Sequence, residues 1–167
     1  MANVNTTLVT NFESSPHIAS PAHQLHGTKR VAMGTIALAA GDLSASDTVM
    51  LAPIPTNASV TSIKLFNDDL DSGTTNTCDV GLWSADGNVT AVDDDAYASA
   101  ITDLRGAVTT GTEVAFEARD INKLGQQVWE DAGQSSDPGG YYYVGLVFDA
   151  AGDTGGDLSF IIEYVVN

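Results

Sequence analysis

The end of the chain alternates large apolar residues with a period of two. The residues that share this face are Leu158, Phe160, Ile162, Tyr164 and Val166. A run ending at Phe148 has the same period, and shorter runs at 30–40, 48–54, 59–66 and 77–83 are bounded by Gly and Asp. This pattern is typical of antiparallel sheets with one buried face. It predicts an all-β chain folded as an antiparallel β-sandwich, either jelly-roll-like or immunoglobulin-like.

The alternation also predicts which side chains point inward. In the strand at 59–66, Thr61 should share a face with Ile63 and Leu65. The other inward positions predicted are Cys78, Val80, Leu82, Tyr142, Val144, Leu146 and Phe148. Pro53 and Pro55 restrict their strand to a sheet edge or a strand end, because proline donates no backbone hydrogen bond.

Two short helices are expected within the sandwich. The first follows the acidic run Asp93–Asp95 and covers AYASAITDL, where Tyr97, Ile101 and Leu104 recur at helical spacing. The second follows Asp120 and covers INKLGQQVWEDAG, with Ile121, Leu124, Val128 and Trp129 along one side.

Residues 1–29 show neither a helical nor a strand period. They contain all three histidines, His17, His23 and His26, together with two of the five prolines. We therefore divide the chain into an extended N-terminal arm, 1–29, and a β-sandwich domain, 30–167.

The charge of the chain excludes several partners. Six basic residues against 22 acidic ones give a net charge of −16. Nucleic acid and anionic membranes both require clustered Lys and Arg, so neither is expected as a partner. The N-terminus has no secretory signal pattern, no apolar run is long enough to span a membrane, and Cys78 has no second cysteine to pair with. We expect synthesis in a cytosol.

Catalysis is not expected, and neither is a cofactor. All three histidines lie in the arm, where no rigid scaffold would hold a general base, and their spacing matches no standard zinc pattern. Cys78 occupies an inward strand position and is expected to be a buried small hydrophobe. Carboxylate pairs alone, without a spacing rule, do not indicate an enzyme.

Two segments could still carry a binding site. Asn67, Asp69 and Asp71 alternate in a loop that ends in glycine, so their oxygens could bind calcium, although turn formation accounts for the same residues. Tyr141 and Tyr143 are expected on an exposed face, where they could form a platform for sugar stacking, although tyrosine is also an ordinary strand former. No metal site is predicted beyond the calcium alternative.

Two stretches, 65–87 and 120–149, resemble small head decoration (cement) proteins that tailed bacteriophages encode near their major capsid protein. The resemblance implies a virion structural protein that forms a homotrimer on the outer capsid surface. There it would bind the major capsid protein and stabilise its contacts, after synthesis in the host cytoplasm.

The arm fits this role, because spaced apolar residues suit an extended segment that orders on binding. The anchors predicted for capsid contact are Phe12, Pro16, Ile18, Pro21 and Leu25. The alternative function is a carbohydrate- or host-surface-binding module, such as a fibre head, that acts through Tyr141, Tyr143 or Trp83.

Overall fold

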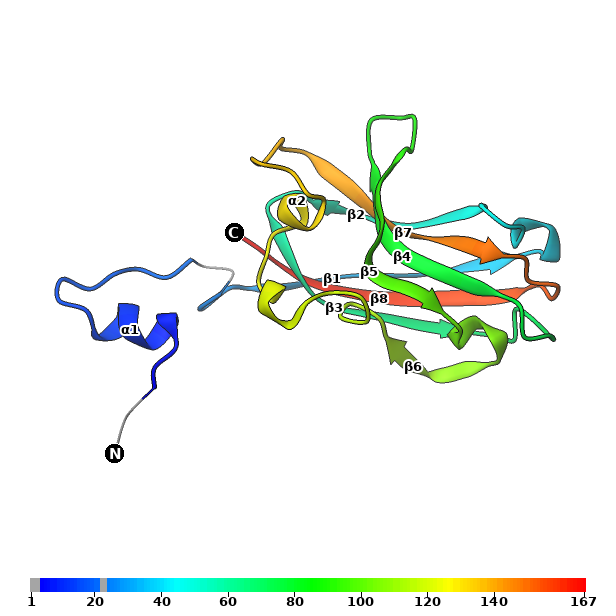
Figure 1. Ribbon diagram of the computed structural model, residues 1–167, viewed down its shortest axis with the longest axis horizontal. Helices are drawn as coiled ribbons and strands as arrows, with labels where there is room; N and C mark the ends of the chain where they lie inside the picture. Colours follow the sequence, from blue (N-terminus) through cyan, green and yellow to red (C-terminus); the bar gives the residue numbers. More distant parts are fainter. Residues whose placement is uncertain (1–3, 22–23) are drawn as a thin grey trace.

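The computed structural model describes residues 4–21 and 24–167, and Figure 1 shows an elongated two-layer sandwich with the N-terminal segment beyond one end. The strands are β1 (Lys29–Leu38), β2 (Thr48–Pro55), β3 (Ala58–Asn67), β4 (Thr77–Ser84), β5 (Ala91–Ile101), β6 (Val108–Glu113), β7 (Tyr141–Ala150) and β8 (Gly156–Val166). The helical elements are α1 (Thr7–Glu13), α2 (Val128–Asp131) and the 3₁₀ turns η1 (Ala40–Asp42), η2 (Asp103–Arg105) and η3 (Ile121–Lys123). The all-β prediction is confirmed.

The strand order identifies the connectivity. One sheet has the order β1-β8-β3-β6 and the other β2-β7-β4-β5, and all the strand pairs are antiparallel. β1 pairs with β8, β2 with β7, β3 with β6 and β4 with β5. The chain is therefore one long hairpin rolled across two sheets, which is the jelly-roll arrangement.

The core lies between the two sheets, where the alternation placed it. Its predicted members that are buried are Cys78, Val80, Leu82, Val144, Leu146, Phe148, Leu158, Phe160 and Ile162. Tyr142, Tyr164 and Val166 are only half-buried and pack against the margin of this core. Loss of any large member would leave a cavity costing about 2–5 kcal/mol.

A bulge in β3 changes one predicted face. The pairing of β3 with β8 skips Thr61, so Thr61 is exposed and Ser62 is buried, the reverse of the alternation. Glu113, at the end of β6, accepts hydrogen bonds from the Ser62 hydroxyl and from the Ile63 amide. Its carboxylate thereby satisfies donors close to the bulge.

The helix predicted after Asp95 is wrong: these residues form the second part of β5, and η2 follows. Val80 pairs with Ala98 and Leu82 with Asp93, so Gly81 alone faces four residues of β5. The predicted apolar residues Tyr97, Ile101 and Leu104 are nevertheless buried. Pairing with β4 holds β5 at Ala91, Asp93, Ala98 and Ile101, whereas a short isolated helix would be marginal.

The second predicted helix is broken in its middle. Gly125 has φ +90°, outside the helical region, and it separates η3 from the single turn of α2. Val128 is buried as predicted, but Ile121 and Leu124 are 94% and 66% exposed. The apolar stripe therefore divides into one part that enters the core and one part that faces outward.

Four strands lie at sheet edges: β1, β2, β5 and β6. The prediction that Pro53 and Pro55 confine their strand to an edge is confirmed, because β2 is the outermost strand of its sheet. In the described ranges, no helix is long and apolar enough to cross a membrane.

Candidate interaction surface

The N-terminal arm contains a helix that the sequence pattern did not predict. The side-chain oxygen of Thr6 caps α1 by accepting a hydrogen bond from the Val9 amide. The helix ends at Glu13, and Ser14 is the C-cap residue, two positions before Pro16. α1 has no buried residue. Its two turns are formed by local hydrogen bonds rather than by packing on the sandwich.

The predicted arm anchors lie largely in solvent. Phe12 is 71% exposed and Ile18 is 52% exposed. Pro16 and Pro21 are also exposed, and Leu25 is half-buried. Side chains of this kind have lost little water in the isolated protein, so their burial remains available for binding, at about 1.5–3 kcal/mol for each large apolar residue.

A second apolar group lies on the loop between β6 and α2. Leu124 lines a shallow hollow of about 400 Å³ whose other walls include Leu8 of the arm and Thr61 of β3. Ile121 lies nearby in sequence and is almost fully exposed. We call the set Phe12, Ile18, Ile121 and Leu124 the arm-end residues. They come from two segments at the end of the sandwich from which the arm extends (Figure 1).

A buried ion pair holds this loop in place. The Arg119 Nη2 atom lies 2.7 Å from Asp131 Oδ2, and both side chains are almost completely buried. Arg119 also donates to the Val60 carbonyl of β3, and its guanidinium lies 5.5 Å from the ring centres of Tyr97 and Phe116. We call Arg119 and Asp131 together the Arg119 clamp. Through these contacts, the clamp holds both ends of the exposed loop against the sandwich.

Burial raises the pKa of the Asp131 carboxyl to about 6, although the charge and hydrogen bonds of Arg119 and the hydroxyl of Tyr97 act in the opposite direction. Tyr97 donates to Asp131 over 3.3 Å. The clamp was not predicted, because its two charged members lie twelve positions apart, and the helix expected after Asp120 is broken between them. Its signal in the sequence is weak: an arginine and an aspartate flank the stripe that contains Ile121 and Leu124.

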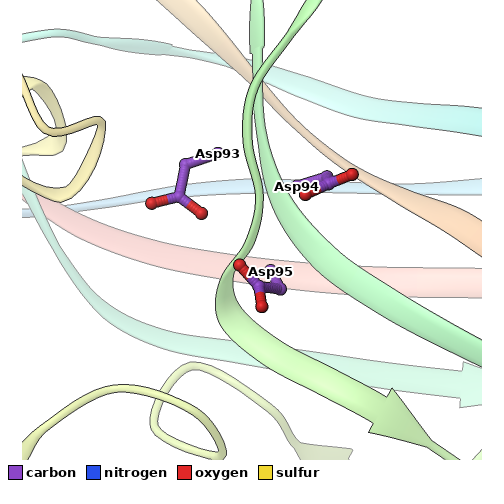
Figure 2. Close-up of side chains that lie close together, drawn as sticks. All are labelled: Asp93, Asp94 and Asp95. Atoms are coloured by element: carbon purple, nitrogen blue, oxygen red, sulfur yellow. The ribbon is translucent and has the colours of Figure 1, made fainter.

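Acidic side chains gather at the wide bulge of β5. The carboxylates of Asp93, Asp94 and Asp95 offer oxygens within 4.8 Å of one another, and Figure 2 shows them around the twist of the strand. The prediction that a helix begins directly after this run is wrong, since the residues after Asp95 continue β5 to Ile101. Burial, and then the neighbouring Asp95, raises the pKa of Asp93. The cluster could attract a cation, but two of its three members are exposed.

The predicted calcium loop is folded by its own hydrogen bonds. The buried Asp71 carboxylate accepts backbone hydrogen bonds from Gly73, Thr75 and Asn76, and Asp69 accepts one from Asp71. The side-chain amide of Asn67 donates to three backbone carbonyls nearby. These contacts match the turn interpretation, and calcium binding here stays an untested prediction.

The aromatic platform is smaller than predicted. Tyr141 is 56% exposed, Tyr143 is half-buried and Trp83 is only 2% exposed. Trp83 therefore cannot stack on a ligand in this conformation, and that part of the alternative is corrected. Tyr143 lies between Pro53 and Trp83 in its sheet.

The remaining predicted reactive residues are placed as follows. Cys78 is fully buried, and burial raises the pKa of its thiol, so it is inert as a nucleophile. His17 is exposed, and its Nδ1 atom lies 3.2 Å from the Phe12 carbonyl oxygen. His26 is exposed as well, and His23 lies outside the described residues. A metal site built from all three histidines is therefore not tested.

Comparison with solved structures identifies similar folds. A chain in the capsid of Ralstonia phage GP4 has a TM-score of 0.60 and 22% identity, covering 84% of this chain and 86% of that one. A chain in the capsid asymmetric unit of cyanophage Pam1 has a TM-score of 0.53 and 19% identity, covering 100% of both. The fold is shared with phage capsid chains. No family model and no curated protein matches the sequence.

Proposed function

We propose that this protein is a structural component of a phage virion, specifically a decoration protein that binds the outside of the head. Two phage capsid structures contain chains of the same fold and similar length, which supports the virion role. The resemblance of 65–87 and 120–149 to cement proteins supports the decoration role.

The observation that carries the proposal is the exposure of the arm-end residues. Phe12 and Ile18 extend on an arm with little packing of its own, while Ile121 and Leu124 are held outward by the Arg119 clamp. An exposed apolar group of this kind marks an interaction surface. The partner we propose is the major capsid protein, whose subunit contacts the bound arm would stabilise.

Acidity suits this role. A net charge of −16 keeps the protein soluble before assembly and away from packaged DNA. The homotrimer implied by the resemblance stays a prediction, because nothing in residues 4–21 and 24–167 singles out three-fold packing.

The test uses purified heads that lack the protein. The full chain should co-sediment with them, and a chain without residues 2–28 should remain folded and fail to do so. Equal binding by the two chains would remove the arm from the interface. No binding by the full chain would reject the decoration role altogether.

The alternative of a carbohydrate- or host-surface-binding module is favoured by one observation, the exposure of Tyr141. This side chain lines a hollow of about 410 Å³ with Tyr142, Gly139 and Gly140. A glycan array comparing the full chain with Tyr141→Ala and Tyr143→Ala separates the two functions, because capsid binding through the arm should survive both changes.

A further inference from the structure

Three of the four edge strands carry features that hinder pairing with another chain. β2 has two prolines and a bulge, β5 has three aspartates and a wide bulge, and β6 is short, with Gly111 at φ +80°. Such features are how soluble proteins prevent edge-to-edge association. β1 has no proline, no bulge and no acidic residue, and its two charged residues lie together at its first two positions.

β1 is suited to pair through its free edge. Its ten residues keep one unbroken register with β8, from Lys29 opposite Val165 to Leu38 opposite Gly156. Among the described residues, no strand lies on its other side. Val31 and Met33 are 46% and 68% exposed, so the strand presents apolar side chains beside unpaired backbone groups.

The charge distribution also singles out this edge. Residues 14–41 contain none of the 22 acidic residues, so self-association here meets little of the repulsion expected elsewhere. The strand begins with the cations Lys29 and Arg30, and the first acid after it is Asp42. An antiparallel second copy would bring the cationic end of each strand to the acidic end of the other.

A hollow beside the end of β1 contains acidic residues that would face the cationic end of a second copy. It measures about 540 Å³, and its walls include Ile36 and Leu38 of β1 together with Asp42 and Asp47. Within the described residues, the Arg30 guanidinium has no hydrogen-bond or ion-pair partner in its own chain.

We propose that β1 pairs antiparallel with β1 of a second copy, which joins the two four-stranded sheets into one and places each Arg30 at the hollow of the other copy. Opposed residues in such a pair lie on the same face, so the two-fold axis passes beside a residue of each strand. The two registers that pair most of β1 place this axis near Met33 or near Gly34. Arg30 then lies opposite Ile36 in the first register and opposite Leu38 in the second. Both registers bring it to Asp42 and Asp47. This contact goes beyond the capsid proposal and does not depend on it, and it predicts a dimer in place of the homotrimer that the resemblance implies.

Sedimentation of the full chain over a concentration series tests the proposal. The expected particle has twice the 17.3 kDa mass of the chain. Arg30→Glu should raise the dissociation constant of the dimer about tenfold or more, because it brings like charges together. Lys64→Glu is the matched control: it changes the net charge equally, at an exposed position on the inner strand β3, and should leave the dimer nearly unchanged.

A second pair of variants keeps the proposal testable if Arg30→Glu does not fold. Met33→Lys places a charge on the free edge and should also dissociate the dimer, whereas Thr110→Lys adds the same charge to β6 and should not. Hydrogen exchange of the unmodified chain should show β1 amides becoming more protected as concentration rises. A monomer at every concentration, a trimer, or equal weakening by matched variants would each overturn the proposal.

Discussion

The backbone of Asp94 crosses directly against Gly81, leaving no space for a side chain at that position of β4. This contact allows β5 to bulge and continue as a strand. It also sets the spacing of the acidic cluster in Figure 2. Asp94 and Asp95 are among the four residues of β5 that face Gly81, and Asp93 directly precedes them.

Gly81→Ala should therefore destabilise the fold. The added β-carbon would meet backbone atoms of Asp93 and Asp94, which cannot move as a side chain can. We expect a loss of about 2–3 kcal/mol in the free energy of unfolding by urea, typical of overpacking. Gly41→Ala is the control, since nothing lies within 4 Å of its added β-carbon, and its change should stay below about 1 kcal/mol. Similar losses of stability in both variants would contradict the close contact between Gly81 and the backbone of Asp94.

The clamp should contribute much more to stability than the surface ion pair. Arg119→Met leaves the buried Asp131 without its partner and should cost about 3–5 kcal/mol. Lys29→Met breaks the Lys29–Glu163 pair, whose side chains are 56% and 31% exposed, and should cost less than about 1 kcal/mol. Urea denaturation of both variants measures the difference. A small loss for Arg119→Met would show that the loop is held by other contacts.

Stability should rise as the pH falls from neutral toward 5. The pKa of Asp131 is about 6 in the folded protein and near 4 when unfolded, so the folded state binds the extra proton between these values. This contribution is complete below the unfolded pKa and is lost as the pH rises through about 6. Burial likewise raises the pKa values of Asp79 and Asp93.

Thermal melts at constant ionic strength measure this effect. Asp131→Asn should flatten the profile between pH 5 and 7.5 by about 1–3 kcal/mol, because an amide does not titrate. A profile that Asp131→Asn leaves unchanged would assign the pH dependence to other carboxyls.

Removing the arm anchors should affect binding and leave stability unchanged. The double variant Phe12→Ser, Ile18→Ser should unfold within about 0.5 kcal/mol of the original chain, since both side chains are mainly in solvent. Its co-sedimentation with undecorated heads should be lost. Val89→Ser, at another exposed apolar residue, serves as the control for surface hydrophobicity. A stability loss in the double variant would mean that the arm packs on its own sandwich.

Much of the sandwich was predictable because strand alternation is a local property. The inward residues of β7 and β8 follow from a period of two, and the edge position of β2 follows from two prolines. The same reasoning failed where a strand departs from regular geometry. The spacing of Tyr97, Ile101 and Leu104 fits a helix, yet a strand with a wide bulge buries the same three residues.

The candidate interaction surface was predictable only in part. The apolar residues proposed as anchors were found from the sequence, but the capped helix that contains Phe12 was missed, because two turns are too short for a clear period. The outward position of Ile121 and Leu124 depends on Gly125 breaking the expected helix and on Arg119 finding Asp131.

The sequence by itself determined an acidic, all-β chain, because charge, alternation and turn residues act over a few neighbouring positions. Tertiary structure alone decided the jelly-roll order, the crossing at Gly81, the buried clamp and the free edge of β1. Each of these depends on contacts between residues that lie in different elements, or on which strands become neighbours, and neither follows from the pattern within any one element.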